Sequence, residues 1–213
     1  MAERRLPGRE DRGVTDLPVL RGGRVILRLP SPEDLAARLE VPIDPDPEAY
    51  RMYGGSGNPK PSTAASIQSL LDEFSQQDYS RTRNFLIAAR VWPDGRAIDV
   101  PIGRYIGIIR LPILSWEDRR ASVNMGIYDR RFWSHGYGSE ALRLLLGYAF
   151  DEAGLHRVGL RVIEYNTRAI RCYEKCGFVR EGVERQSALV DGAWYDDIMM
   201  SILEPEYRAR FRR

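Results

Sequence analysis

The sequence predicts an α/β fold, in which seven strands and about four helices follow one another along the chain. A β-prone segment at 122–128 leads through a glycine-bearing loop into a helix, whose apolar residues recur at helical spacing up to Phe150. A second strand leads to Asn166, a good N-cap for a short helix, and Gly177 stands where a C-cap glycine belongs. Two β-prone stretches then flank Asp191–Gly192, which is a strong signal for a hairpin.

The elements that precede this segment are predicted in the same way. A strand at 24–29 is followed by a helix that begins at Ser31, with Pro32 at its first position. A second helix and two further strands come next, at 67–74, 84–91 and 102–111. The segment between the two helices, residues 44–62, is dense in Pro and Gly and too long for a simple connector, and such loops are usually functional or disordered.

The composition indicates an ordinary globular protein. Of its 213 residues, 43% are hydrophobic and 29% are charged, and the formal net charge of +2 gives no reason to expect a nucleic acid as partner. No apolar run is long enough to cross a membrane, and the N-terminus lacks the apolar core of a signal peptide, so we expect a cytoplasmic protein without a membrane partner. Residues 1–18 are polar and arginine-rich, which predicts a flexible arm ahead of a single domain at 19–213.

The two cysteines, Cys172 and Cys176, lie four residues apart on one predicted helix. That spacing is poor for a disulfide, and no cluster of His or Cys accompanies them. We therefore expect small buried thiols and no metal site.

The loop that precedes the third helix holds two glycines one residue apart, Gly136 and Gly138. Backbone N–H groups at such a helix start can close on an anion, with the positive end of the helix dipole behind them. The same glycines can equally serve a tight β–α turn, and the loop alone does not decide between the two. The run also fits the dinucleotide pattern G-x-G-x-x-A, with Glu164 at the spacing of the ribose-binding acid, but too little chain follows for a doubly wound sheet.

Together, these segments resemble the GNAT superfamily of acetyl-CoA-dependent N-acyltransferases over roughly residues 24–203. The phosphate-loop motif of that superfamily, Arg/Gln-x-x-Gly-x-Gly/Ala, is followed by a strand, an Asn, a short helix and Tyr-x-x-x-Gly-Phe. The matching residues here are Gly136, Gly138, Asn166, Tyr173, Gly177 and Phe178. The stretches WSHGYGSEAL, NTRAIRCYEKCGF and DGAWYDD look most like the ribosomal-protein N-terminal (alanine/serine) acetyltransferase group. Two departures are visible: Trp133 occupies the Arg/Gln position, and Ser134 stands where this group commonly has glycine.

The resemblance implies the GNAT fold, a mixed and mostly antiparallel seven-stranded sheet flanked by helices, in which the fourth and fifth strands splay apart. Gly126 interrupts the fourth strand, so we place a bulge there and expect the splay to begin at it. In the family, the backbone groups left unpaired by the splay bind the pantetheine arm of CoA. Acetyl-CoA is therefore the expected co-substrate, with no metal. The residues expected to bind it are Met125, Ile127, Tyr128, Trp133, Ser134, His135, Gly136, Tyr137, Gly138, Ser139, Asn166, Ala169 and Tyr173.

Acetyl transfer requires that the thioester and a neutral amine be held in line, that the thioester oxygen be polarised and that the departing thiolate receive a proton. A backbone N–H at Ile127 or Tyr128 would polarise the oxygen. Tyr173 stands where the family commonly has a general acid, and a phenol suits that role, with a core aromatic as the alternative. Asp196 matches an acid common in the resembling group, and we assign it to catalysis as a group that attracts the amine or relays its proton. An ordinary ion pair with an arginine is the equal alternative.

Contacts with the acceptor are predicted at Tyr50, Tyr53, Asn124, Trp194 and Asp197. Asn124 stands about where many relatives place a glutamate, so direct base catalysis at that position is in doubt. Three functions remain open. The resemblance favours transfer to the N-terminal amine of a peptide or protein, by direct attack in a ternary complex; the others are transfer to a small amine, such as an antibiotic or polyamine, and binding of acyl-CoA without catalysis. The expected partners are CoA and an amine acceptor, and a homodimer is compatible because dimers are common in the superfamily.

Overall fold

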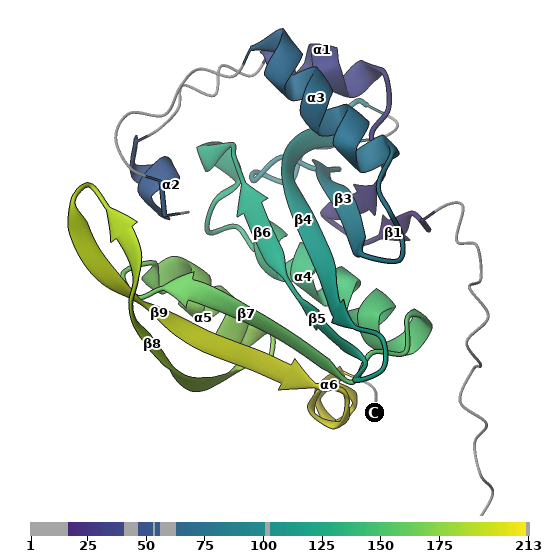
Figure 1. Cartoon of the computed structure of the whole chain (residues 1–213). Coiled ribbons are helices and arrows are strands. Elements are labelled where there is room, and N and C mark those ends of the chain that lie inside the picture. The colour runs from purple at the N-terminus through teal and green to yellow at the C-terminus, as the bar shows by residue number, and fades with distance from the viewer. Residues whose placement is uncertain (1–16, 41–46, 53, 56–62, 101–102, 212–213) are drawn as a thin grey trace, which may run out of the picture.

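The computed structural model describes residues 17–40, 47–52, 54–55, 63–100 and 103–211 (Figure 1). Its strands are Leu20–Arg21 (β1), Val25–Arg28 (β2), Thr82–Ala89 (β3), Arg104–Ser115 (β4), Arg120–Ser122 (β5), Asn124–Ile127 (β6), Arg157–Ile163 (β7), Val179–Val190 (β8) and Ala193–Leu203 (β9). Its helices are Glu33–Glu40 (α1), Pro47–Met52 (α2), Ala64–Ser75 (α3), Tyr137–Gly147 (α4), Thr167–Lys175 (α5) and Glu204–Phe211 (α6). A 3₁₀ turn at Arg130–Phe132 precedes α4, and a π turn at Tyr148–Glu152 follows it.

The strands form one mixed sheet in the order β1-β2-β3-β4-β5-β7-β9-β8, with β6 paired to β4. Within the described strands only β5 and β7 pair in parallel, so the expected mixed and mostly antiparallel sheet is confirmed. The sheet has nine strands rather than seven. One addition is the short β1, and the other arises because the predicted strand at 122–128 is divided into β5 and β6. The register places Pro112 of β4 opposite Ser122, and a proline has no N–H to donate to the ladder at that point.

The sheet opens between β6 and β7, which diverge from a common origin near β5 (Figure 1). The N–H of Val123 still donates to the Gly159 oxygen of β7 at 2.8 Å. Beyond this bond β6 pairs only with β4, and β7 pairs on its other side with β9. The expected splay is therefore present, and it begins at Val123.

The prediction of a bulge at Gly126 was wrong. Gly126 lies in regular register opposite Ile108, and the bulge is on β4, where the register with β3 shifts between Ile87 and Ala88. The backbones of β4 and β6 approach closely here, because a Cβ on Gly107 would lie only 2.1 Å from the Gly126 oxygen. Gly126 thus lies at a close contact between β4 and β6, and it does not interrupt β6.

Replacing Gly107 with Ala is expected to lower the free energy of unfolding by about 1–3 kcal/mol, because the new methyl group meets backbone that must shift. Urea unfolding measures this loss. Gly182→Ala is the matched control, since Gly182 also lies in a strand and a Cβ there would meet no atom within 4 Å. Equal stability of the two variants would contradict the close approach of β4 and β6.

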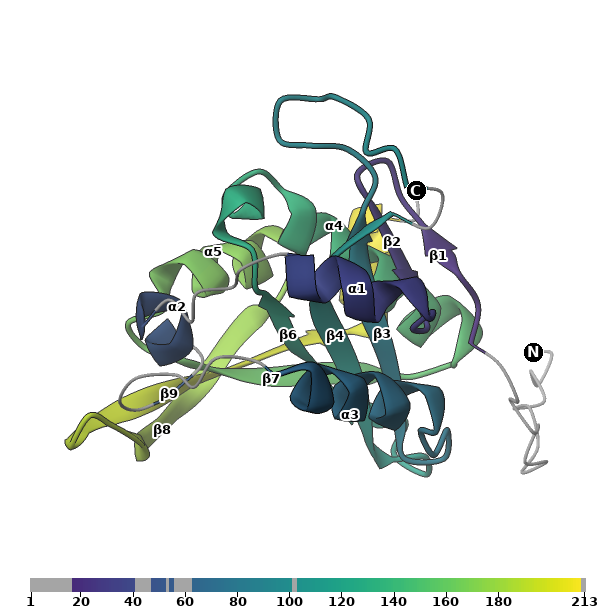
Figure 2. The same cartoon turned by 90° about the horizontal axis from the view of Figure 1, so that it is seen from above.

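Helices cover both faces of the sheet (Figure 2). On one face, α4 and α5 pack on the larger hydrophobic cluster, to which they contribute Ala141, Leu142, Leu145, Leu146, Ile170 and Tyr173. On the other face, Ile67, Leu71 and Phe74 of α3 pack with Leu86 and Tyr105 of the sheet. Leu35 of α1 joins this second cluster. Neither α4 and α5 on one face nor α1 and α3 on the other closes the opening between β6 and β7. The candidate site lies in this opening.

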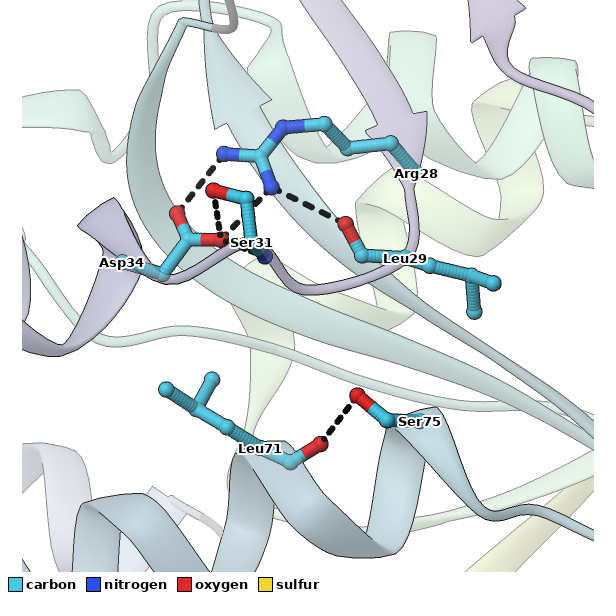
Figure 3. Close-up of polar contacts among 6 residues, drawn as sticks. All are labelled: Arg28, Leu29, Ser31, Asp34, Leu71 and Ser75. Atoms are coloured by element: carbon cyan, nitrogen blue, oxygen red, sulfur yellow. Dashed lines mark hydrogen bonds and ion pairs between the residues drawn. The ribbon is translucent and has the colours of Figure 1, made fainter.

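The loop between β2 and α1 is fixed by a buried ion pair (Figure 3). Both terminal nitrogens of Arg28 donate to the Asp34 carboxylate, at 2.6 and 2.7 Å. The N–H and hydroxyl of Ser31 donate to the same carboxylate, at 2.7 and 3.1 Å. The side chains of Arg28 and Asp34 are 7% and 1% exposed. The predicted helix is present, and this pair sets its position against β2.

The ends of the described chain differ from the prediction. Leu17, which was assigned to the flexible arm, is 6% exposed and belongs to the larger cluster, while residues 1–16 lie outside the described residues. The helix α6 was not predicted. Its Tyr207 is 4% exposed, and the ring lies 5.0 Å from that of Phe150. An apolar residue at each end thus packs against the core.

Candidate active site

A cavity of about 800 Å³ occupies the opening between β6 and β7. Both strands, the glycine loop, α5, the β8–β9 hairpin and the end of α2 contribute to its lining. Most of the residues predicted to bind the cofactor line it: Met125, Ile127, Trp133, Ser134, Gly136, Tyr137, Gly138, Ser139, Asn166, Ala169 and Tyr173. Two do not, Tyr128 and the exposed His135. The sequence motifs therefore converge on one hollow, although they are far apart in the chain.

The backbone of β6 decides which amide faces the cavity. The Tyr128 N–H donates to the Ile106 oxygen of β4 at 2.8 Å, so it belongs to the ladder and does not serve the cavity. Amide directions alternate along an antiparallel strand, so the N–H groups of Met125 and Ile127 are directed away from β4 and toward the cavity. The Tyr128 ring packs against Tyr105, on the face covered by α3. Of the two amides predicted to polarise a thioester, that of Ile127 is therefore the one directed toward the cavity.

The glycine loop forms the start of α4. Gly136 is the N-cap with φ of +87°, a left-handed conformation that favours glycine, and its carbonyl accepts the Glu140 N–H at 3.0 Å. A Cβ at Gly136 would meet no atom within 4 Å, so the loop is open at this point. The first N–H groups of a helix have no partner within it. The loop thus combines backbone donors, open space and a helix start, as a phosphate site requires.

Trp133, one of the two departures from the family motif, connects three parts of the site. Its indole N–H donates to the Ile127 oxygen at 2.7 Å. The guanidinium carbon of Arg168, on α5, lies 3.5 Å from the centre of its ring, and that of Arg130 lies 5.2 Å away. The other departure, Ser134, has φ of +62°, which explains why glycine is common at that position. Trp133 therefore links the loop, β6 and α5 through its own contacts.

Asn166 caps α5 and joins it to α2. Its side-chain oxygen accepts the Ala169 N–H at 3.1 Å, which confirms the predicted cap, and its amide nitrogen donates to the Met52 oxygen at 2.9 Å. The hydroxyl of Tyr165 donates to the Arg51 oxygen at 2.6 Å. The segment around α2 thus reaches the cavity, where Met52 and Gly54 contribute to the lining.

The two tyrosines predicted to contact the acceptor from this segment are not among the lining residues. Tyr50 is 41% exposed, and its ring lies against Gly55, where a Cβ would be 2.5 Å from the ring. The position of Tyr53 lies outside the described residues. The segment therefore reaches the cavity through Met52 and Gly54, and a contact of Tyr50 with the acceptor stays a prediction.

Tyr173 stands at the end of α5 and lines the cavity with 8% of its surface exposed. Its ring lies 5.9 Å from that of Phe178, the next aromatic residue of the same motif. Its carbonyl accepts the N–H groups of Cys176 and Phe178, at 3.0 and 3.1 Å. These contacts fix the position of the phenol beside the cavity.

The two cysteines occupy different surroundings. Cys176 is fully buried, as predicted, whereas Cys172 lines the cavity, with its sulfur 3.3 Å from the Ser139 hydroxyl. Hydrogen bonding from the Cys176 thiol, assisted by Ser139, lowers the pKa of Cys172 to about 7 against the opposing effect of burial. The same bond and burial raise the pKa of Cys176. Cys172 is therefore the thiol that ionises first.

Alkylation of Cys172 by iodoacetamide is expected to accelerate between about pH 6 and 8 and then to level off, because the thiolate forms as pH rises through its pKa of about 7. Saturating CoA should protect it, since Cys172 lines the cavity. Mass spectrometry after timed labelling measures both effects, and Cys172→Ser is the control. A rate that still climbs above about pH 9, or labelling unaffected by CoA, would contradict this placement.

The side of the cavity away from α4 and α5 carries polar side chains. Met125 and Ile127 face α4, where they would contact a Cβ on Gly138, so Asn124 is directed to the opposite face. Asp197 of β9 is 7% exposed, and its carboxylate lies 3.9 Å from the Arg161 Nε of β7. Asn124, Arg161 and Asp197 all line the cavity.

The structure does not bring Asp196 or Trp194 into the cavity lining. The Asp196 carboxylate accepts the Gln186 N–H of β8 at 2.8 Å, and Trp194 is 58% exposed. Successive side chains of a strand point to opposite faces, so Asp197 takes the place predicted for Asp196. Arg161, which was not predicted, faces the cavity beside it. The residues that point to the other face of β7, Val158, Leu160 and Val162, are apolar and buried, and this alternation was the available signal.

The chain belongs to the GNAT acetyltransferase family, whose domain model matches residues 24–179. A probable N-acetyltransferase of Bacillus subtilis, YjcK, is 37% identical over 78 residues, which are 37% of this chain and 43% of that protein. A putative ribosomal N-acetyltransferase of the same bacterium, YdaF, is 31% identical over 105 residues, 49% of this chain and 57% of that protein. The chain thus spans about half the length of these curated relatives.

The crystal structure of spermidine N-acetyltransferase from Vibrio cholerae, in complex with CoA and spermine, has the same fold. It matches with a TM-score of 0.67 and 20% identity, over 87% of this chain and 99% of that one. Among the described helices, none combines the length and apolar character needed to span a membrane. No group of three metal-ligating side chains occurs in the described ranges.

Proposed function

We propose that this protein transfers an acetyl group from acetyl-CoA to the α-amine of a peptide or protein. The observation that carries the proposal is the cavity between β6 and β7, in which outward-directed amides of β6 lie beside an open glycine loop at a helix start. Family membership supports the cofactor, and the charges of the cavity support the acceptor.

The residues present fit CoA. Gly136 leaves the loop open to a diphosphate, and α5 adds three cationic side chains to the lining, Arg168, Arg171 and Lys175. The edge of β6 offers the N–H groups of Met125 and Ile127 to an amide-bearing chain, as a strand offers them to a neighbour. Bound acetyl-CoA would supply the activated acetyl group.

The side chains around the cavity have separate roles in this proposal. The Ile127 N–H polarises the thioester oxygen, because it is directed into the cavity rather than into the ladder with β4. The Tyr173 hydroxyl donates the proton that the leaving thiolate requires. Asp197 binds the amine of the acceptor. This amine loses its proton with little assistance, since the reference pKa of an α-amine is near 8.

The charge of the cavity favours a peptide over a polyamine. Asp197 is the single carboxylate among the lining residues that the structure describes, whereas four cations line the same hollow, Arg161, Arg168, Arg171 and Lys175. Even if CoA phosphates neutralise those on α5, Arg161 remains on the acceptor side. A polyamine carries several positive charges and would require more than one carboxylate.

The test uses purified protein, acetyl-CoA and three acceptors: a lysine-free peptide with a free α-amine, its N-acetylated copy and spermidine. Release of CoA and the mass of each acceptor are followed together. The proposal predicts acetylation of the free peptide alone. Transfer to spermidine with none to the peptide would overturn the acceptor assignment.

A further inference from the structure

Within the described residues, the acceptor side of the cavity holds two opposite charges, on Asp197 and Arg161, whose nearest atoms lie 3.9 Å apart. Asp197 is 93% buried, yet within the described residues its one contact with a charged side chain is the 3.9 Å approach of Arg161, which is too long for a hydrogen bond. A carboxylate in such a place binds a cation best when the cation also donates hydrogen bonds to it. An amine bound in the cavity would bring such donors to Asp197, which lines it.

Arg161 is placed differently from its partner. Its side chain is 64% exposed, and across the described ranges its guanidinium makes no contact with a second carboxylate. Two N–H groups of a guanidinium match the two oxygens of a carboxylate in one plane. Arg161 can therefore bind an external carboxylate while it remains close to Asp197.

The geometry points to an acceptor in which a carboxylate follows the reacting amine closely, and we infer that the cavity selects peptides with an acidic side chain at the second residue. Asp197 receives the α-amine and Arg161 the acidic side chain. This inference rests on the proposed transfer to peptide α-amines and names the peptides that are preferred.

Within the described stretches of chain, a hydroxyl group without a partner also lines the cavity, that of Ser187. Its hydroxyl oxygen is buried and has no hydrogen-bond partner in the part of the chain that the structure describes, and the residue lines the cavity. A peptide group of the acceptor offers both a donor and an acceptor for such a hydroxyl. The Ser187 hydroxyl thus favours an extended peptide as acceptor over an isolated amine.

The test compares two peptides that differ only at the second residue, Asp or Asn, in otherwise identical lysine-free sequences. The wild-type protein is expected to favour the Asp peptide by at least about tenfold in kcat/KM. A charge-assisted pair between Arg161 and the Asp side chain accounts for a preference of this size. In Arg161→Ala this ratio should fall to about one, and in Arg161→Lys it should be intermediate, because lysine keeps the charge but not the fork. In a further comparison, a peptide with Lys at the second residue replaces the Asn peptide. Arg161→Glu should then favour the Lys peptide over the Asp peptide, which is the reverse of the wild-type order. A copy of the Lys peptide whose side-chain amine is blocked is the control.

Arg120→Ala is the matched control, since it removes one positive charge from β5 at a residue that does not line the cavity, and it should keep the wild-type ratio. Equal rates for the Asp and Asn peptides in the wild type, or an unchanged ratio in Arg161→Ala, would overturn the inference while leaving the proposed function intact. Absence of transfer to both peptides, with CoA still bound, would instead overturn the proposed function itself. The ratio is insensitive to a general loss of folded protein, so a merely structural role of Arg161 would not change it.

Discussion

Replacing Tyr173 with Phe is expected to lower kcat by about 10²–10⁴-fold, the usual contribution of a general acid. The binding of CoA should change little, because the substitution removes only the hydroxyl and leaves the ring packed beside Phe178. Steady-state kinetics with a peptide acceptor, together with calorimetric titration of CoA, separate these two effects.

A second tyrosine provides the control for this substitution. Tyr195→Phe also removes one phenol hydroxyl, but Tyr195 packs against Tyr165 and does not line the cavity. Its kcat should match that of the wild type. If Tyr173→Phe weakened CoA binding as much as it slowed turnover, Tyr173 would be a packing residue and not the proton donor.

Replacing Asp34 with Ala should lower the free energy of unfolding by about 3–5 kcal/mol. The substitution leaves the Arg28 guanidinium buried without the carboxylate that accepts two of its hydrogen bonds (Figure 3). It also removes the acceptor for the Ser31 N–H and hydroxyl. Urea unfolding monitored by circular dichroism measures the change.

The neighbouring acid controls for the loss of a carboxylate in the same turn. Glu33 is exposed, and Glu33→Ala should alter stability by less than about 0.5 kcal/mol. Replacing both partners of the buried pair with apolar residues, as in Arg28→Met with Asp34→Leu, should cost less than Asp34→Ala alone. A loss below about 1 kcal/mol in Asp34→Ala would show that water reaches the pair.

Local signals in the sequence were sufficient for much of the fold and of the cofactor side of the cavity. Gly177 has φ of +94°, as a helix C-cap glycine requires, and Asp191–Gly192 has the two positive φ values of a tight hairpin turn. Asn166 caps α5 through a bond to a residue three positions away. Each of these features depends on neighbours in the chain, so the local pattern determines it.

Other features depend on pairing between distant segments, and the sequence did not reveal them. Whether Ile127 or Tyr128 faces the cavity is decided by the register of β6 against β4. The choice between Asp196 and Asp197 depends on the register of β9 in the same way, since a shift by one residue exchanges the faces of a strand.

The connection between α2 and the site joins Asn166 to Met52 across 114 residues of sequence. No local pattern predicts a contact of that kind, because it forms only when the sheet has brought both segments together. The side of the cavity that carries Asn124, Arg161 and Asp197 was therefore the least predictable part of the site, and it is the part to which we assign the acceptor.

The most direct test of acetyl transfer to a peptide amine uses acetyl-labelled CoA, the purified protein and an extract of cells that lack it, divided into macromolecular and small-molecule fractions. Acceptor amines in such an extract are still free. Label in the macromolecular fraction, located at protein N-termini by mass spectrometry, is the predicted result. Label confined to the small-molecule fraction would contradict the peptide assignment, and binding of CoA without label in either fraction would contradict the catalytic role of Tyr173.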